Sequence, residues 1–361
     1  MSQNKPDSPI SMSDLAQELG VSVTTISRAL SDHHSIGPAT KQKVLKLAKK
    51  LNYQPNHMAA ALRKGKSKLL GVMVPHIEGR FFPSIVHGIE TIASRAGFNV
   101  LICQSHEDAV QERKNIETLL SAQVAGILVS VARGTTDFKH FEKVTKRNIP
   151  LVFYDRIQES DSVNAVVLND REAAYQTTCH LLDQGCRRVA HLAGAQHLNI
   201  YRNRLLGYQD ALRSYNIPLN DDLVITCGMT QEEGTAAMHR LLVLPQPPDA
   251  IFGAGDYVVL GALQVLKKKG IRVPQEMMLA GFSNEPFTLI TEPQLTSVDQ
   301  RCEEMGQAAV RLCLELLEAK GARFAPRHVV LKGELYIRES SQRLAVEAPK
   351  LAGEATVSQQ R

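Results

Sequence analysis

The chain has 361 residues, a formal net charge of +5, 43% hydrophobic residues and no tryptophan. This length exceeds what one hydrophobic core usually organises, and this apolar fraction excludes a disordered chain. The excess charge is confined to one end, because residues 1–64 hold nine basic and four acidic side chains, whereas residues 65–361 hold 33 of each sign. A small basic module on a neutral body suggests an anionic polymer as partner, although a merely soluble basic terminus is the alternative.

The sequence lacks the features of an exported or membrane-bound protein. Its first residues, MSQNKPDSPIS, are polar, and no apolar run approaches the ~18 residues that a membrane span needs. The six cysteines are scattered without a Cys-x-x-Cys pair, so neither a zinc site nor a disulfide framework is indicated. We expect a cytoplasmic protein with no membrane contact and no cofactor.

Two short helices are predicted near the start, over residues 12–18 and 22–31. Gly20 falls in the turn between them, where a positive φ is cheap only for glycine. Ser22 can cap the second helix, because its hydroxyl can accept a hydrogen bond from a backbone N–H two or three residues later. The side chains expected to pack between the helices are Leu15, Leu19, Val21, Ile26, Ala29 and Leu30.

The second helix then presents an outward polar face with one apolar tip, formed by Val23, Thr24, Ser27 and Arg28. Such a face suits base edges and phosphates in a major groove. A third helix follows Pro38, with an apolar stripe on one side and lysines on the other. Three short helices with basic edges predict a helix-turn-helix domain; an ordinary helical hairpin with a solvated lysine face is the alternative. The candidate DNA contacts in this domain are Ser22, Val23, Thr24, Ser27 and Arg28.

An alanine-rich stretch, residues 57–63, comes next. A helix of about seven residues is marginal alone in water, so it needs a partner. Two copies packed through residues 59–61 in a dimer on DNA supply one, and Leu62 then becomes an apolar wedge for a minor-groove base step. A flexible tether is the competing interpretation, and the residues alone leave both open.

The head resembles the LacI/GalR family of bacterial transcription regulators in three segments, DLAQELGVSVTTISRAL, TKQKV and LNYQPNHMAAAL, within a likeness that runs from about Ile10 to Arg338. The resemblance implies that Val23, Thr24 and Arg28 read the major groove. It further implies a set of hinge residues, in which Asn56 and His57 open a hinge helix, Ala59 lies against the minor groove and Leu62 intercalates.

The rest of the chain alternates apolar strand-like runs with helical segments, in two sets. Uninterrupted apolar strands between helices indicate buried parallel sheets wrapped by helices, here two doubly wound lobes with a ligand crevice at the carboxyl ends of their strands. The family likeness implies the layout of periplasmic sugar-binding proteins, with three chain crossings between lobes. The expected fold class is therefore α/β, with a three-helix head on a two-lobed, periplasmic-binding-protein-like body. The expected segments are a head at 1–55, a hinge at 56–68, a first lobe at about 69–164 and 297–327, a second lobe at about 165–296 and 328–340, and a flexible tail at 341–361.

Polar or aromatic residues just past predicted strands or at a helix start are the candidate effector contacts, namely Phe81, Phe82, Asp155, Arg204, Asp256, Ser283 and Asn284. Carboxylate, amide and guanidinium groups can each bind neighbouring hydroxyls, so a hydroxyl-rich ligand fits. Simpler roles remain open: Asp155 can pair locally with Arg156 or cap a helix, Asp256 can cap the next helix, and Arg204 can anchor a surface carboxylate.

The resemblance implies effector contacts for Asp155 and Arg204. The sequence also departs from the family, which often has Asn-Asp where this chain has Gly255-Asp256, and Asp-Asp or Asp-Asn where it has Ser283-Asn284, so an amide and a charged contact are lost. These departures leave the sugar unnamed, and a phosphorylated sugar or a uronate stays open.

We therefore predict a ligand-responsive DNA-binding regulator, a repressor of carbohydrate-utilisation genes that binds a palindromic operator. A homodimer is expected, because the tail after residue 340 has no heptad pattern for a helix-bundle tetramer. A free sugar receptor or transport component is one alternative, which needs a signal peptide and a dispensable head. An enzyme is another, but the chain contains no G-x-S-x-G, H-E-x-x-H, P-loop or G-x-G-x-x-G motif.

Overall fold

The computed structural model describes residues 10–53, 67–319 and 325–343. The chain divides into two compact units, Met1–Ser67 and Lys68–Arg361, which we call the head and the body. Among the described residues, no helix combines the length and the apolar character that a membrane span requires.

The described part of the head consists of three helices, α1 (Met12–Leu19), α2 (Val23–Leu30) and α3 (Pro38–Lys50). The predicted turn is confirmed: Gly20 is left-handed with φ 65°, and its N–H donates to the carbonyl of Ala16. Ser22 precedes α2, and its hydroxyl accepts from the N–H of Thr25 at 3.1 Å. A small core lies between the three helices, formed by Leu15, Ala16, Ile26, Ala29, Val44 and Ala48.

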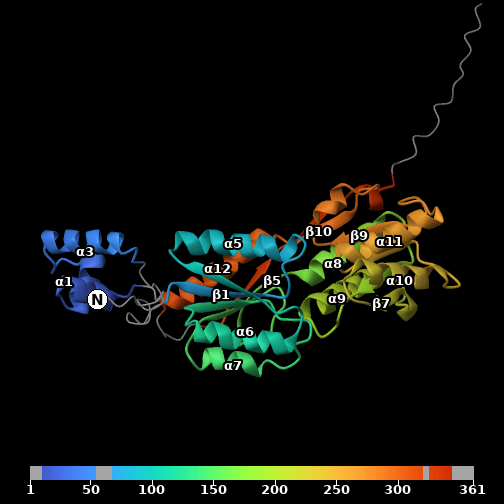
Figure 1. Ribbon diagram of the computed structural model, residues 1–361. Helices are drawn as coiled ribbons and strands as arrows, with labels where there is room; N and C mark the ends of the chain where they lie inside the picture. Colours follow the sequence, from blue (N-terminus) through green and yellow to red (C-terminus); the bar gives the residue numbers. More distant parts are fainter. Residues whose placement is uncertain (1–9, 54–66, 320–324, 344–361) are drawn as a thin grey trace, which may run out of the picture. The chain divides into compact units, whose positions relative to one another are not determined.

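The first lobe of the body is a parallel sheet in the order β11-β5-β4-β3-β1-β2. Its strands are β1 (Leu69–Val74), β2 (Asn99–Gln104), β3 (Gly126–Val129), β4 (Leu151–Tyr154), β5 (Asn164–Leu168) and β11 (His328–Leu331). Its helices are α5 (Phe81–Arg95), α6 (Ala109–Ser121), α7 (Lys139–Thr145) and α12 (Cys302–Glu318). Helices α5 and α12 cover one face of the sheet, and α6 and α7 cover the other (Figure 1).

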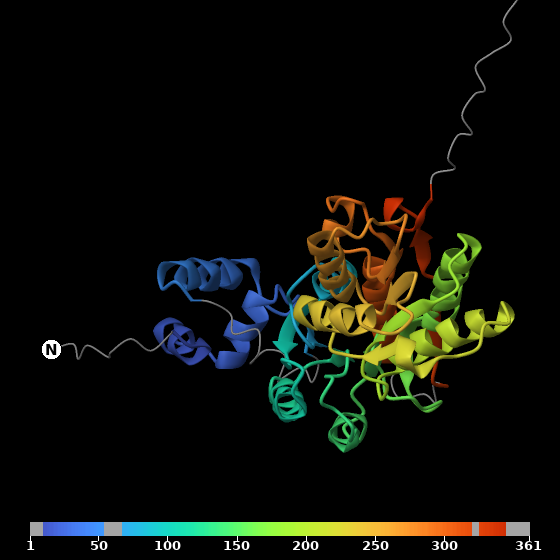
Figure 2. The ribbon, with the colours of Figure 1, turned by 90° about the vertical axis from the view of Figure 1, so that its right-hand side faces the viewer.

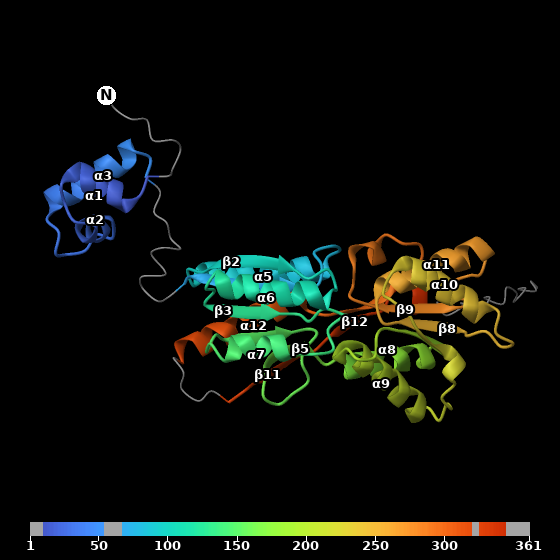
Figure 3. The ribbon, with the colours of Figure 1, turned by 60° about the horizontal axis from the view of Figure 1, so that its bottom comes forward.

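The second lobe is a sheet in the order β12-β10-β9-β8-β6-β7, parallel except for the antiparallel edge strand β12. Its strands are β6 (Val189–Ala193), β7 (Val224–Thr226), β8 (Ala250–Gly253), β9 (Met278–Phe282), β10 (Thr296–Asp299) and β12 (Glu334–Tyr336). Its helices are α8 (Asp170–Asp183), α9 (Asn199–Ser214), α10 (Gln231–Leu242) and α11 (Asp256–Lys269), with short 3-10 turns at Asp221–Leu223, Pro286–Leu289 and Glu339–Ser341. Helices α8 and α9 pack together on one face, and α10 and α11 on the other (Figure 3).

The strand pairing differs from the lobe boundaries expected from the sequence. Strand β5 joins the first sheet beside β4, β11 joins it beside β5, and β10 joins the second sheet beside β9. The chain therefore crosses between lobes after β5, after β10 and after β11, and strands far apart in the sequence lie side by side (Figure 2). The expected boundaries at 165, 297 and 328 each fall one strand early, because a buried apolar strand has the same pattern in either sheet.

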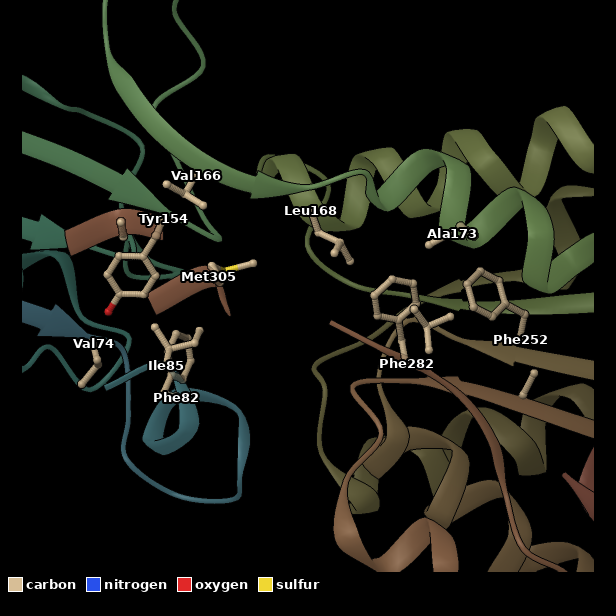
Figure 4. Packing of buried hydrophobic residues seen from close by; sticks show 14 of the residues in the cluster. Val74, Phe82, Ile85, Tyr154, Val166, Leu168, Ala173, Phe252, Phe282 and Met305 are labelled. Atoms are coloured by element: carbon tan, nitrogen blue, oxygen red, sulfur yellow. The ribbon is translucent and has the colours of Figure 1, made fainter. Parts of the chain in front are cut away.

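Buried side chains continue from one lobe into the other. Figure 4 shows Phe82, Ile85 and Tyr154 grouped in the first lobe, and Phe252 and Phe282 grouped in the second. These side chains belong to one contiguous cluster of buried residues, so the crossing strands are part of the core rather than a solvated tether.

Helices α5 and α12 cross at two glycines, Gly88 and Gly306. A Cβ built on Gly306 would lie 2.1 Å from the carbonyl oxygen of Ile85, and one on Gly88 would lie 2.2 Å from that of Glu303. Backbone atoms cannot move aside as a flexible side chain can, so both positions require glycine.

We therefore expect Gly306→Ala to destabilise the body by about 1–3 kcal/mol, although alanine normally favours a helix. Urea unfolding of the full chain measures this effect. The control is Arg311→Ala on the exposed side of the same helix, with an expected change within about 0.5 kcal/mol. A Gly306→Ala protein as stable as the control would show that the two helices separate without cost.

Candidate DNA-reading face and effector cleft

The predicted DNA-reading face lies on the solvent side of α2. Ile26 and Ala29 turn inward, whereas Val23, Thr24 and Arg28 are exposed. Ser22 is also exposed and Ser27 is half-buried. Val23 exposes 39% of its surface, and an exposed methyl-bearing side chain at this position suits contact with a thymine methyl group.

Most lysines of α3 add exposed positive charge to the head. Lys43, Lys46 and Lys49 are exposed, but Lys41 is half-buried and pairs with Asp32 at 2.6 Å. The partner of Lys41 lies in the loop before α3. The predicted hinge residues are outside the described residues, namely Asn56, His57, Ala59 and Leu62.

A cleft of about 960 Å³ is lined by residues of both lobes, at the carboxyl ends of the parallel strands. This size accommodates a small-molecule ligand. Six of the seven predicted effector contacts line it, namely Phe81, Phe82, Asp155, Arg204, Asp256 and Ser283.

Asp155 follows β4 in a left-handed conformation, with φ 59°, and is buried. The hydroxyl of Ser130 donates to its carboxylate at 3.2 Å, and Nε of Arg156 lies 3.9 Å from the same oxygen. Burial raises the pKa of Asp155 from 3.8 to about 6, although the neighbouring guanidinium groups of Arg156 and Arg204 oppose the shift. The local ion pair with Arg156 that the sequence left open is therefore present, at the long N–O distance of 3.9 Å. The carboxylate of Asp155 still lines the cleft.

Arg204 is buried and bonded to three groups of the protein. It pairs with the buried carboxylate of Asp170 at 2.7 Å, donates to the carbonyl of Ala254 and to the side chain of Gln300, and stacks 3.7 Å from the ring centre of Phe282. The carboxylate that it anchors is buried, not at the surface as the simpler interpretation from the sequence supposed. Arg204 thus fixes the start of α8 and the β10–α12 crossing beside the cleft.

Asp256 is the first residue of α11, and Gly255 occupies the capping position. Its carboxylate accepts from the hydroxyl of Ser297 at 2.7 Å and from the N–H of Glu285 at 2.8 Å. The alternative role as a helix cap is therefore wrong. Burial raises the pKa of Asp256 to about 6. The side chain holds the segment after β9 in place at the cleft wall.

Asn284 does not line the cleft, in contrast to its prediction as an effector contact. Its amide donates to Asp299 at 3.0 Å and accepts from Arg338 at 2.6 Å. These bonds use both ends of the amide inside the second lobe. Asn284 instead adjoins a smaller hollow of about 360 Å³, which Phe81 and Ser283 also line.

The two phenylalanines differ in their availability. Phe82 is 1% exposed and packs in the core edge-on to His76 and Phe81. Phe81 is half-buried and presents its ring at the cleft, together with Tyr257 on the opposite lobe. Phe81 is therefore the ring that can stack on a ligand, and Phe82 supports it.

Several cleft residues were not predicted from the sequence. His76, Glu285 and Tyr257 line the cleft, and each lies next to or within three residues of a strand end or a predicted contact. Position after a strand was the signal that could have found them. In the described ranges, no group of three or more histidine, cysteine or acidic side chains is placed to hold a metal ion.

Direct polar contacts join the two lobes at the cleft walls. The N–H of Arg80 donates to Glu285 at 3.1 Å, and the side chain of Asn199 bonds the backbone of Asp155 and Ile157 at 2.9 and 3.0 Å. A change in the angle between the lobes must break or remake these bonds.

The raised pKa of Asp155 predicts a pH dependence of stability. The folded protein holds a proton between about pH 4 and pH 6 that the unfolded chain releases, so the free energy of unfolding falls as the pH rises through this window. Asp155→Asn removes the part of this fall that comes from Asp155, about 1–3 kcal/mol, and asparagine tolerates the left-handed conformation.

Urea unfolding at pH 4.5 and pH 7 measures the fall in the free energy of unfolding. From pH 4.5 to pH 7 the variant should lose less stability than the wild type, while the exposed Asp161→Asn control should lose as much as the wild type. Equal losses in both variants would contradict the prediction.

Comparison with known proteins gives two family matches. Residues 11–56 match the bacterial regulatory proteins of the lacI family, and residues 178–341 match a periplasmic binding protein-like domain. The HTH-type transcriptional repressor CytR of Escherichia coli (strain K12) is 32% identical over 345 residues, which cover 95% of this chain and 100% of that protein. The chain belongs to the lacI family of bacterial regulatory proteins. This family consists of DNA-binding transcriptional regulators rather than enzymes, which confirms the predicted ligand-responsive regulator.

Solved structures of lacI-family proteins confirm the fold. The transcriptional regulator CelR in complex with cellobiose has a TM-score of 0.70 and 27% identity, covering 92% of this chain and 99% of that one. The lac repressor dimer bound to operator and an anti-inducer has a TM-score of 0.81, covering 93% of this chain and 100% of that one. At 23% identity, the second likeness bears on the fold alone.

Proposed function

We propose that this lacI-family chain is a cytoplasmic repressor of carbohydrate-utilisation genes that binds a palindromic operator as a homodimer. A sugar or sugar derivative is its effector, bound in the cleft between the lobes. The observation that carries the proposal is the cleft itself, where Asp155 and Arg156 of one lobe face Arg204 and Asp256 of the other in a chain that begins with a helix-turn-helix head.

In this proposal α2 enters the major groove with Val23, Thr24, Ser27 and Arg28, and Ser22 contacts the backbone at the helix start. The hinge residues Asn56, His57, Ala59 and Leu62 lie in the minor groove, with Leu62 as the wedge. The support is the exposed face of α2 and the family likeness of the hinge segment.

The effector would act by changing the bonds between the lobes. Its affinity must differ between two arrangements of the lobes, since only a differential affinity shifts an equilibrium. The Arg80–Glu285 and Asn199–Asp155 contacts are the bonds that such a shift would alter. A coupling of about 1–3 kcal/mol is enough to change operator occupancy several-fold or more.

Selection of duplexes from a random pool by the full chain tests this function. We expect enrichment of an inverted repeat, because two symmetric heads read two half-sites. Binding to the selected duplex is then measured with and without a panel of sugars. Failure to enrich any sequence, at low as well as moderate salt, would overturn the proposal.

A further inference from the structure

The charge of the effector follows from the charges that line the cleft. Seven carboxylate side chains but only three guanidinium groups line it, those of Arg133, Arg156 and Arg204. A ligand entering this cleft therefore meets an excess of formal negative charge. Low-dielectric walls strengthen the field of such a cleft.

Two of the three cations are already neutralised by the protein. Arg204 is paired with Asp170 and also donates to the carbonyl of Ala254 and the side chain of Gln300. Arg156 places Nη1 2.8 Å from both carboxylate oxygens of Glu107. Only Arg133, exposed at the rim, is left without an ion pair among the described residues.

Helix N-termini commonly bind anions, and three of the four that lie at the cleft contact or carry acidic side chains. Glu285 accepts the N–H of Arg80 at the start of α5. Asp256 opens α11, and Glu232 and Glu233 lie in the first turn of α10. The fourth helix that begins at the cleft, α9, lines it with the uncharged side chains of Ile200 and Tyr201.

The polar atoms still free at the cleft suit hydroxyl groups. Nε of Arg156 is buried and has no hydrogen-bond partner among the described residues, and the same holds for Nδ1 of His76. The carboxylate of Asp155, which can accept further hydrogen bonds, lies 3.9 Å from that Nε. A hydroxyl can accept from the guanidinium and donate to the carboxylate at once, whereas an anionic oxygen would be repelled by the carboxylate.

We propose that the cleft selects hydroxyl-bearing ring compounds that are uncharged or cationic, and that it excludes phosphorylated and carboxylated ones. This proposal rests on the proposed effector function. Among the effectors that the sequence leaves open, the proposal favours a neutral sugar over a phosphorylated sugar or a uronate.

Matched ligand sets test the selection on the full chain without DNA, by thermal shift and calorimetric titration. One set is glucose, glucosamine, glucose 6-phosphate and glucuronate, and others are ribose with ribose 5-phosphate and cytidine with its 5′-monophosphate. We expect at least one neutral or cationic member to bind, and its anionic counterpart to bind at least tenfold more weakly. An anionic member that binds as tightly as its parent, or a panel in which no neutral or cationic member binds, would overturn the proposal.

A second measurement assigns the exclusion to the cleft charges. Glu107→Gln frees the guanidinium of Arg156, so the ratio of neutral-ligand affinity to anionic-ligand affinity should fall at least tenfold. Glu117→Gln on α6 removes an exposed carboxylate paired with Lys143 and should leave this affinity ratio unchanged. Equal ratios in the two variants would contradict the electrostatic cause. Because neither measurement uses DNA, their failure and a failure to select an operator are separate results.

Discussion

Arg204→Met is expected to destabilise the body by about 3–5 kcal/mol, because it leaves the buried carboxylate of Asp170 without its partner. Methionine keeps much of the contact with Phe282, so the loss of the ion pair dominates. Chemical unfolding at pH 7 measures the change. Burial already raises the pKa of Asp170, and removing the cation raises it further, so the penalty should shrink as the pH falls and the carboxyl takes up a proton.

The matched control for this change is Arg213→Met on the same helix. Arg213 pairs with Asp210, but its side chain is 56% exposed, and exposed pairs contribute about 0–1 kcal/mol. Similar losses for the two variants, or a loss at Arg204 that does not depend on pH, would show that the buried pair does not anchor α8 as described.

Arg28→Ala is expected to weaken binding to the selected operator by about 1–3 kcal/mol while changing binding to a scrambled duplex much less. The reason is that Arg28 is exposed on the face of α2 that we propose to read bases, whereas non-specific binding depends on the summed phosphate contacts. Fluorescence anisotropy with both duplexes, at one fixed salt concentration, gives the two affinities.

Lys43→Ala is the comparison variant, since Lys43 is exposed on α3 and does not belong to the face of α2. Removing a lysine that contacts only phosphates should weaken binding to both duplexes to a similar extent. If Arg28→Ala behaved like Lys43→Ala, Arg28 would be a phosphate contact and the base-reading role would fall to its neighbours on α2.

The head could be predicted closely from the sequence because its determinants are local. The left-handed Gly20 and the cap at Ser22 depend on residues within four positions. The alternating elements of the body were also predictable, since each apolar strand and each helix carries its own period. The position of candidate contacts after strand ends brought six of seven to the cleft.

The errors concern partners that are distant in the sequence. Asp256 is held by Ser297, 41 residues away, and Asn284 by Arg338, 54 residues away. The sheet that β5 joins is decided by its neighbour β4 and by β11, whose His328 pairs with Ala165 from 163 residues earlier. No local pattern reports such pairings, so a side chain after a strand can equally face the ligand or a neighbouring loop.

Reciprocal coupling is the most direct test of the central claim, that a ligand in the cleft controls DNA binding by the head. The affinity of the full chain for a ligand found in the panel is measured by titration, with and without saturating selected operator. Thermodynamic linkage requires the operator to change ligand affinity by the same factor by which the ligand changes operator affinity. The account predicts equal factors of about 5–150 in the two directions. A ligand affinity that saturating operator leaves unchanged would contradict it.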